Sequence, residues 1–185
     1  MIFKKTGLDD SYIVELEKLS DARGFFARYY CEREFKEAGL NSNWVQINNS
    51  VSDKKGTLRG MHYQNAPFSE VKLVRCVSGE IWDCIVDLRP DSRTFGNYFG
   101  AYLSADNRKM MYVPEGFAHG FITLSDDAEA IYLVSQHYTP NAEGSLLWSD
   151  PDLGIDWPIV PSVLSDKDAT APAFATLKAQ FKGSN

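Results

Sequence analysis

The stretch VKLVRCVSGEIWDCIVDLRP, from Val71 to Pro90, decides the fold class. It consists of two apolar runs that are separated by Gly79 and closed by Pro90. The pattern in the first run repeats every two residues, which is the spacing of side chains on one face of a β-strand and not of a helix. The stretch therefore predicts two consecutive β-strands.

The same signal recurs on both sides of this stretch. Extended segments are predicted at residues 44–52, 56–64, 98–103, 109–113, 120–124 and 128–138. Helical signal is confined to residues 32–38, which Gly39 would end as a C-cap, and to residues 176–181. Short strands bounded by Gly, Pro, Asp and Ser predict a mainly β sandwich or barrel. No repeat or shift in composition marks a linker, so residues 1–185 are expected to form a single domain.

Composition narrows the functional class. The 185 residues are 44% hydrophobic and carry a formal net charge of −6. An acidic chain lacks the basic surface that unselective nucleic-acid binding requires, so nucleic acid is not an expected partner. No apolar run approaches the ~20 residues that span a bilayer, and the N-terminus does not resemble a signal peptide. Cys31, Cys76 and Cys84 are too few for a disulfide framework, so we expect reduced core cysteines in a cytoplasmic protein without a membrane partner.

Polar residues interrupt the apolar pattern in residues 44–52. The polar and apolar side chains fall on opposite faces: Gln46, Asn48, Ser50 and Ser52 against Val45, Ile47 and Val51. Two readings stay open. Either the strand is half exposed to water, or its polar face lines a cavity in which amides bind hydroxyls and phosphates.

Residues 56–64 carry a second polar group. Arg59, His62 and Gln64 lie within six residues, and Gly60 allows a close approach of backbone or ligand. His119 lies between small and aromatic residues, and His137 is expected at the surface near a strand end.

These residues also allow a metal site. The pattern is similar to the metal-binding motif of cupin barrels, in which His-x-His is followed by Glu. His62, Glu70 and His119 could supply two imidazoles and one carboxylate, which would make the protein a metal-dependent oxygenase. Against this, the second ligand position holds Gln64, a poor ligand for a transition metal, and Lys72 would place a cation nearby.

A series of short motifs runs in order along almost the whole chain. They are DARGFF at 21–26, QxNxS at 46–50, LRGMHYQ at 58–64, KLVR at 72–75, PEGFAHGF at 114–121, Tyr132, YxP and Glu143 at 138–143, DP at 150–151, IDWP at 155–158 and LSDKD at 164–168. Each motif alone is weak. Together and in one register, they resemble the dTDP-4-dehydrorhamnose 3,5-epimerase family.

The resemblance implies a mainly β, metal-free cupin-type (jelly-roll) β-barrel with short flanking helices, which forms a homodimer by exchanging strands. It implies no cofactor and a nucleoside-diphosphate 4-keto-6-deoxyhexose as substrate. His62 would be the base that abstracts a proton, Asp168 its carboxylate partner, and Tyr132 the proton donor on the other face of the sugar. The other matched positions imply substrate contacts: Arg23, Gln46, Asn48, Arg59, Lys72, His119, Glu143 and Lys167.

One position departs from the family pattern. Where the family commonly has a glutamate that contacts the nucleotide, this chain has Arg28. A cation with five donors in place of an acceptor changes which groups can be recognised at that end. dTDP, CDP and GDP therefore stay open as carriers, and Phe26 and Tyr138 are aromatic side chains that could stack on the base.

The predicted chemistry is the inversion of a carbon beside a ketone. A base removes a proton, an enolate is held, and a proton returns on the opposite face. Histidine, with an ordinary pKa of about 6.5, suits the base, and tyrosine, at about 10, suits the donor. Lys72 is the candidate for stabilising the enolate oxygen, and Arg23 and Arg59 suit a diphosphate because arginine binds phosphate in a forked geometry.

No redox cofactor is needed for this reaction, and the sequence contains neither G-x-G-x-x-G nor a P-loop. Besides the oxygenase, two alternatives stay open. The protein inverts carbon 3 alone, or it binds a sugar nucleotide without catalysis.

Overall fold

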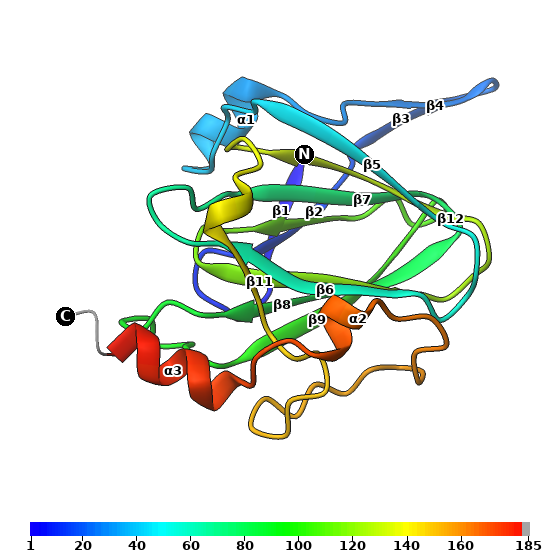
Figure 1. Ribbon diagram of the computed structural model, residues 1–185. Coiled ribbons are helices and arrows are strands. Elements are labelled where there is room, and N and C mark those ends of the chain that lie inside the picture. The colour runs from blue at the N-terminus through cyan, green and yellow to red at the C-terminus, as the bar shows by residue number, and fades with distance from the viewer. Residues whose placement is uncertain (183–185) are drawn as a thin grey trace.

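Two β-sheets face one another in the computed structural model, which describes residues 1–182 (Figure 1). The strands are β1 (Ile2–Lys5), β2 (Tyr12–Glu15), β3 (Lys18–Asp21), β4 (Gly24–Ala27), β5 (Gln46–Ser52), β6 (Leu58–Gln64), β7 (Lys72–Ser78), β8 (Glu80–Asp87), β9 (Tyr98–Ser104), β10 (Met110–Val113), β11 (Phe117–Thr123), β12 (Ala128–Val134) and β13 (Glu143–Ser145). The helices are α1 (Glu32–Glu37), the 3-10 helix η1 (Pro140–Ala142), α2 (Asp166–Ala169) and α3 (Phe174–Lys182).

The order of the strands is that of a jelly-roll sandwich. One sheet has six strands, β1-β2-β10-β7-β12-β5, and the other has five, β13-β6-β11-β8-β9. The pairs within both sheets are antiparallel, and β3 and β4 form a separate antiparallel hairpin. The predicted fold class, a mainly β cupin-type (jelly-roll) β-barrel with short flanking helices, is confirmed, with the barrel formed by two sheets that are not closed on one another.

All the predicted strands are present, and two of their boundaries differ by more than two residues. Strand β11 begins at Phe117 and not at residue 120, because the turn before it ends at Gly116, whose φ is +77°. Strand β12 ends at Val134 and not at residue 138, because Val134 pairs with the first residue of its neighbour β5. The four-residue strands β1 to β4 were not predicted, since they are too short to show a clear alternation.

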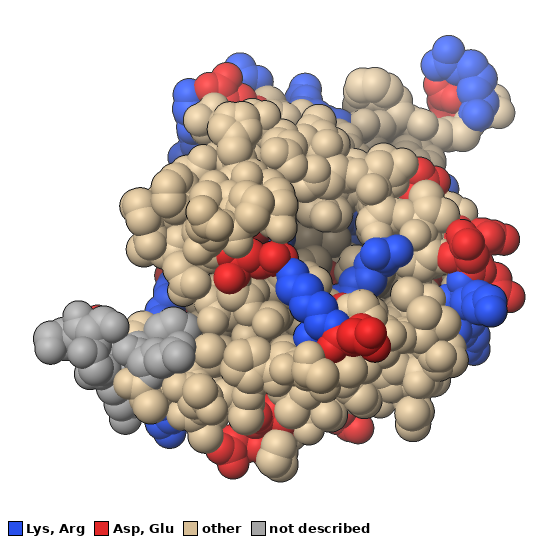
Figure 2. All heavy atoms as spheres, in the orientation of Figure 1, with Lys and Arg blue, Asp and Glu red and all other residues tan. Residues whose placement is uncertain are grey.

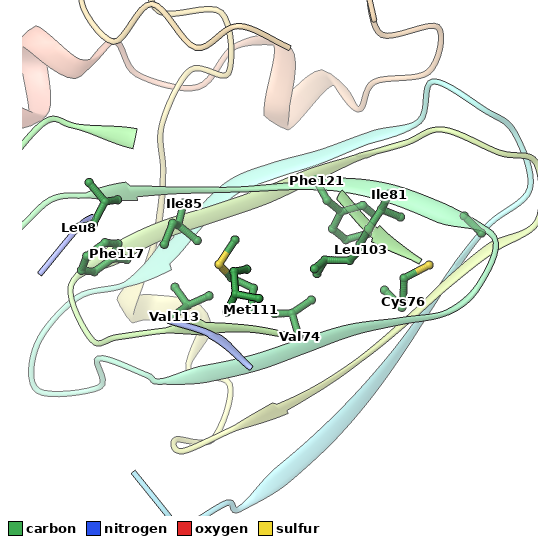
Figure 3. Packing of buried hydrophobic residues seen from close by; sticks show 13 residues of the cluster. Leu8, Val74, Cys76, Ile81, Ile85, Leu103, Met111, Val113, Phe117 and Phe121 are labelled. Carbon is green, nitrogen blue, oxygen red and sulfur yellow. The ribbon is translucent and has the colours of Figure 1, made fainter. Parts of the chain in front are cut away.

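The main apolar core lies between the two sheets (Figure 3). Val74 on β7 and Met111 on β10 come from the six-stranded sheet. They meet Ile81 on β8 and Phe121 on β11 from the five-stranded sheet. Burial of apolar surface stabilises a fold by about 25 cal/mol per Å², so this layer holds the two sheets together.

A second apolar layer covers the outer face of each sheet. Phe35 of α1 is fully buried against the six-stranded sheet, and the helix ends before Gly39, as predicted. Leu146, Leu153 and Phe174 of the C-terminal part pack on the five-stranded sheet. The helix predicted at residues 176–181 lies within α3. Across residues 1–182, none of the helices has the length and apolar character that crossing a membrane requires.

The cysteines differ in burial. Cys76 and Cys84 are buried and unpaired, as predicted. The prediction is wrong for Cys31, which is only half-buried, because it lies at the start of α1 at the edge of the outer layer.

Strand β6 approaches β11 very closely at Gly60. A Cβ atom here would lie 2.5 Å from the Cα atom of Gly120 and 2.8 Å from the carbonyl oxygen of His119. The φ angle of Gly60, +122°, is also one that other residues rarely adopt. The expected close approach is therefore one of backbone against backbone, and it sets His62 opposite His119 in the antiparallel register.

Candidate active site

Two adjoining cavities open between the sheets. The larger has a volume of about 450 Å³ and the smaller about 280 Å³. Both are lined by His62, Lys72 and Tyr132, so they form one continuous candidate site. Figure 2 shows one face of the molecule with a hollow whose rim carries Lys, Arg, Asp and Glu side chains.

Strand alternation explains why these side chains point inward. Met61 and Tyr63 pack in the outer layer of the five-stranded sheet, so His62 between them faces the cavity. On the other sheet, Leu73 and Leu133 belong to the outer layer. Their neighbours Lys72 and Tyr132 therefore face inward, and the site is built from both walls of the sandwich.

His62 is held by a carboxylate. Its Nε2 lies 2.6 Å from Oδ1 of Asp168, which is buried on α2. The hydroxyl of Ser165 accepts a hydrogen bond from the backbone N–H of Asp168 and so caps α2. Because Nε2 donates to Asp168, the Nδ1 atom of His62 is the ring nitrogen left to act as a base.

The pKa of His62 reflects two opposing effects. Burial lowers it, the carboxylate of Asp168 raises it, and the result lies below the ordinary value for histidine. His62 is consequently a neutral imidazole near pH 7.

A second histidine–carboxylate pair lies next to the first. Nε2 of His119 lies 2.8 and 2.6 Å from the two carboxylate oxygens of Asp83, and both residues are buried. Asp83 was not predicted as a site residue. The sequence signal for it is an acidic residue between Trp82 and Cys84, which face the outer layer, so that Asp83 faces inward.

Lys72 is paired with an acidic residue that was considered only as a metal ligand. Its Nζ atom lies 3.1 Å from Oε1 of Glu70, and both side chains are almost buried. Glu70 also lines the smaller cavity together with Tyr132. Burial and the charge of Glu70 raise the pKa of Tyr132 above its ordinary value, so that its hydroxyl stays protonated at neutral pH.

The structure distinguishes the two readings of β5. The polar face points into the site, where Gln46, Asn48 and Ser50 line the cavities and Gln46 donates a hydrogen bond to Asn48 over 2.7 Å. The apolar face is the exposed one, with Ile47 66% exposed. A strand that turns its polar side chains inward and its apolar side chains outward fits the cavity reading.

Other predicted residues surround the opening. Arg59 donates to Oγ of Ser52 and to the carbonyl oxygen of Val51. Lys167 lies 2.7 Å from Glu143, which also accepts a hydrogen bond from the Tyr138 hydroxyl. Burial raises the pKa of Glu143, but the hydrogen bond and charge of Lys167 outweigh it and leave the pKa below its ordinary value.

Three predicted residues lie away from these cavities. Arg23 is 89% exposed in the β3–β4 hairpin and pairs with Asp21. Phe26, in the same hairpin, is 71% exposed, and Arg28 follows it and pairs with Glu34 of α1. Figure 1 shows the hairpin projecting from the body of the molecule. Within a single chain, these residues do not join the site.

The residues considered for a metal site are engaged elsewhere. Gln64 donates to the carbonyl oxygen of Phe68 and accepts from the N–H of Thr139, so its amide holds two loops. His62 and His119 each bond a separate carboxylate. No group of three or more His, Cys, Asp and Glu residues within residues 1–182 is arranged to hold a metal ion. His137 is exposed, as predicted.

Comparisons with known proteins agree with this arrangement. A family model described as dTDP-4-dehydrorhamnose 3,5-epimerase matches residues 5–176. The dTDP-4-dehydrorhamnose 3,5-epimerase of Salmonella typhimurium is 47% identical over 175 residues, which are 93% of this chain and 94% of that protein.

Two solved structures share the fold and contain dTDP sugars. The dTDP-6-deoxy-D-glucose-3,5-epimerase of Legionella pneumophila, in complex with dTDP-4-keto-L-rhamnose, has a TM-score of 0.89 and 38% identity and covers 97% of this chain and 96% of its own. ChmJ of Streptomyces bikiniensis, a 3'-monoepimerase in complex with dTDP-quinovose, has a TM-score of 0.88 and 35% identity. The match covers 96% of this chain and 90% of ChmJ. From its sequence, its fold and its motifs, the chain belongs to the dTDP-4-dehydrorhamnose 3,5-epimerase family.

Proposed function

We propose that the protein is an isomerase that inverts carbon 3 and carbon 5 of a nucleoside-diphosphate 4-keto-6-deoxyhexose without a cofactor. One observation carries the proposal: His62 and Tyr132 line the same cavities from opposite sheets. Inversion requires this placement, because a proton leaves one face of the sugar and another returns on the opposite face. The names of the relatives and the dTDP sugars bound to two of them support the substrate class.

In the first step, His62 takes the proton from carbon 3. Nδ1 accepts it, and the electron pair of the broken C–H bond forms the enolate with the negative charge on the oxygen of carbon 4. The carboxylate of Asp168, 2.6 Å from Nε2, orients the ring and stabilises the imidazolium that forms.

Lys72 stabilises the enolate. Its ammonium has three donors and is paired with Glu70 through one of them, which leaves the others for the developing oxyanion. In a site shielded from water, one such donor contributes about 2.7–4 kcal/mol to the transition state.

Tyr132 completes the inversion. Its hydroxyl gives a proton to the enolate carbon from the wall opposite His62, and solvent then returns a proton to Tyr132 and removes one from His62. The same sequence at carbon 5 gives the doubly inverted product.

The remaining lining residues suit the rest of the substrate. Arg59, His119 and Lys167 offer positive charge or donors to a diphosphate, while Gln46 and Asn48 offer amides to hydroxyls and phosphates. Tyr138 and Glu143 lie at the end of the smaller cavity, where a base can stack on the ring. A dTDP carrier is favoured by the dTDP sugars of the relatives, with CDP and GDP as alternatives.

We further propose a homodimer in which each site is completed by the other subunit. Two features support it: β5 is an edge strand with an exposed apolar face, and the β3–β4 hairpin extends from the body with Leu19 and Phe26 exposed. A second copy that covers the edge of β5 would bury this apolar surface. Its hairpin would then bring Arg23, Phe26 and Arg28 to the opening of the first cavity.

The extent of the domain and its compartment belong to the same proposal. Both sheets build one site, and the family match spans residues 5–176, which supports a single epimerase domain across residues 1–185. Three unpaired cysteines support a reducing compartment, the cytoplasm.

The direct test is incubation with 4-keto-6-deoxyglucose carried on dTDP, CDP or GDP in heavy water, followed by NMR. We expect deuterium at carbons 3 and 5 with inversion at both, fastest for dTDP. Deuterium at carbon 3 alone would instead assign the single inversion of the 3'-monoepimerase, whose fold is shared. Binding without any exchange would assign a binding module, and activity that requires a stoichiometric transition metal would assign the oxygenase.

A further inference from the structure

Glu70 is an acidic residue that lines the smaller cavity and has no part in the proposed mechanism. It lies two residues before Lys72, where β7 begins, and its side chain is 13% exposed. Its Oε1 atom is 3.1 Å from Nζ of Lys72, whose side chain is 10% exposed. A carboxylate beside the lysine that would stabilise an enolate works against that negative charge, because like charges repel strongly where water is excluded. Glu70 is therefore expected to have another effect.

We propose that Glu70 is a positioning residue: its carboxylate offsets the positive charge of Lys72 at the wall from which the proton returns, and so extends to higher pH the range over which Tyr132 is a neutral phenol and a proton donor. This inference rests on the proposed function and adds a residue to it. The smaller cavity is lined by Glu70, Lys72 and Tyr132 together, so the carboxylate, the ammonium and the phenol face the same space.

The other groups around Tyr132 are mostly cationic or donors. The titratable or charged residues that line the two cavities with it and Glu70 are Arg59, His62, Tyr63, Lys72, His119, Tyr138, Glu143, Lys167 and Asp168. Glu143 and Asp168 are already paired with Lys167 and His62. Without the charge of Glu70, only burial would oppose the guanidinium of Arg59, so the tyrosinate, which cannot donate a proton, would form at a lower pH.

The effects on Tyr132 point the same way. Burial and the Glu70 charge raise the pKa of the phenol, whereas the guanidinium of Arg59 and the side chain of Asn48 lower it. The donor is lost as pH rises through this pKa, so a lower pKa narrows the pH range of inversion from the alkaline side.

The test is a titration of Tyr132 by the ultraviolet absorbance of tyrosinate. The chain has nine tyrosines. Subtracting the titration curve of the Tyr132→Phe variant from that of the native protein leaves the titration of Tyr132. In Glu70→Gln, and in Glu70→Ala, we expect the titration midpoint of Tyr132 to fall by about 1 pH unit. Glu70→Asp keeps the charge and should restore most of the native midpoint. If one of the two variants, Glu70→Gln or Glu70→Ala, does not fold, the titration of the other is sufficient for the test.

The matched control is Glu37→Gln, which removes an exposed carboxylate from α1, away from the cavities. An unchanged Tyr132 midpoint in a folded Glu70→Gln or Glu70→Ala variant, or an equal fall in Glu37→Gln, would overturn the inference. The titration needs no substrate, so it tests the role of Glu70 separately from the proposed function. The proposed function is tested by turnover of the substrate by the native protein. With turnover, the alkaline limit of inversion in Glu70→Gln should move to lower pH by the same shift.

Discussion

His62 works with one ring nitrogen held and the other free, and this sets its pH dependence. Burial lowers its pKa and Asp168 raises it. Since the neutral ring is the proposed base, we expect proton abstraction to be lost only as pH falls through a pKa that lies below the ordinary value of about 6.5.

Asp168→Asn tests this balance. Without the carboxylate, nothing offsets burial, so the pKa of His62 falls further and the acid limit of deuterium exchange moves to lower pH. The rate at neutral pH should fall by about 100-fold or more, because the imidazolium loses its stabilising partner. Exchange rates by NMR across pH measure both effects. An acid limit that moves to higher pH would show that Asp168 does not act on His62 in this way.

Single residues could be predicted where alternation along a strand decides their direction. The inward face of β5, with Gln46 and Asn48, follows from spacing alone. The contact between His62 and Asp168 does not, because 106 residues separate them and only the fold brings them together. Asp83 was missed for the same reason, since 36 residues separate it from His119. Glu70, two residues from Lys72, was considered only as a metal ligand.

At the scale of elements, the close crossing of β6 and β11 positions both histidine–carboxylate pairs. His62 and His119 lie opposite one another in the register, two residues along β6 from the crossing at Gly60. Any displacement between these strands changes the distance from the base to the wall that holds Tyr132.

Gly60→Ala is therefore expected to separate the strands. Its Cβ would lie 2.5 Å from backbone, and such overpacking costs about 1–3 kcal/mol in addition to the strain of its φ. We expect a lower free energy of unfolding by urea denaturation and a loss of most exchange activity. Gly7→Ala is the matched control, because Gly7 also has a positive φ, +102°, but nothing lies within 4 Å of its Cβ position. Equal effects of the two substitutions would contradict a role for the close approach.

Elements with a long, regular pattern were predictable, and short ones were not. Strands β7 and β8 follow from their apolar runs, and α1 from its stop at Gly39. Helix α2 has only four residues, too few to show a helical period, yet it carries Asp168. The hairpin β3–β4 was recognised only as a family motif, because charged residues obscure its alternation.

At the scale of the whole molecule, one chain leaves part of the predicted site unused. Arg23, Phe26 and Arg28 lie outside the cavities, and the apolar face of β5 is exposed. The order of motifs predicted the family and the sandwich. It did not show which sheet carries each residue, since sheet order follows from long-range pairing.

Mixing two inactive variants tests completion of the site by a partner. We expect His62→Ala and Arg23→Ala to be nearly inactive alone. In a mixed dimer, one cavity has an intact His62 and receives an intact Arg23 from the other subunit, so random mixing should restore about a quarter of native activity. Steady-state assays after co-refolding measure this. No recovery despite mixed dimers, shown by size and by tags, would place Arg23 in the site of its own chain.

The most direct test of the account is the Tyr132→Phe variant, followed by NMR in heavy water on a dTDP-linked 4-keto-6-deoxyhexose. His62 lies on the other wall, so carbon 3 should still exchange its proton for deuterium, at a rate within about tenfold of the native rate, while inversion stops. His62→Ala should stop both. Inversion at the native rate in Tyr132→Phe would contradict the two-wall mechanism.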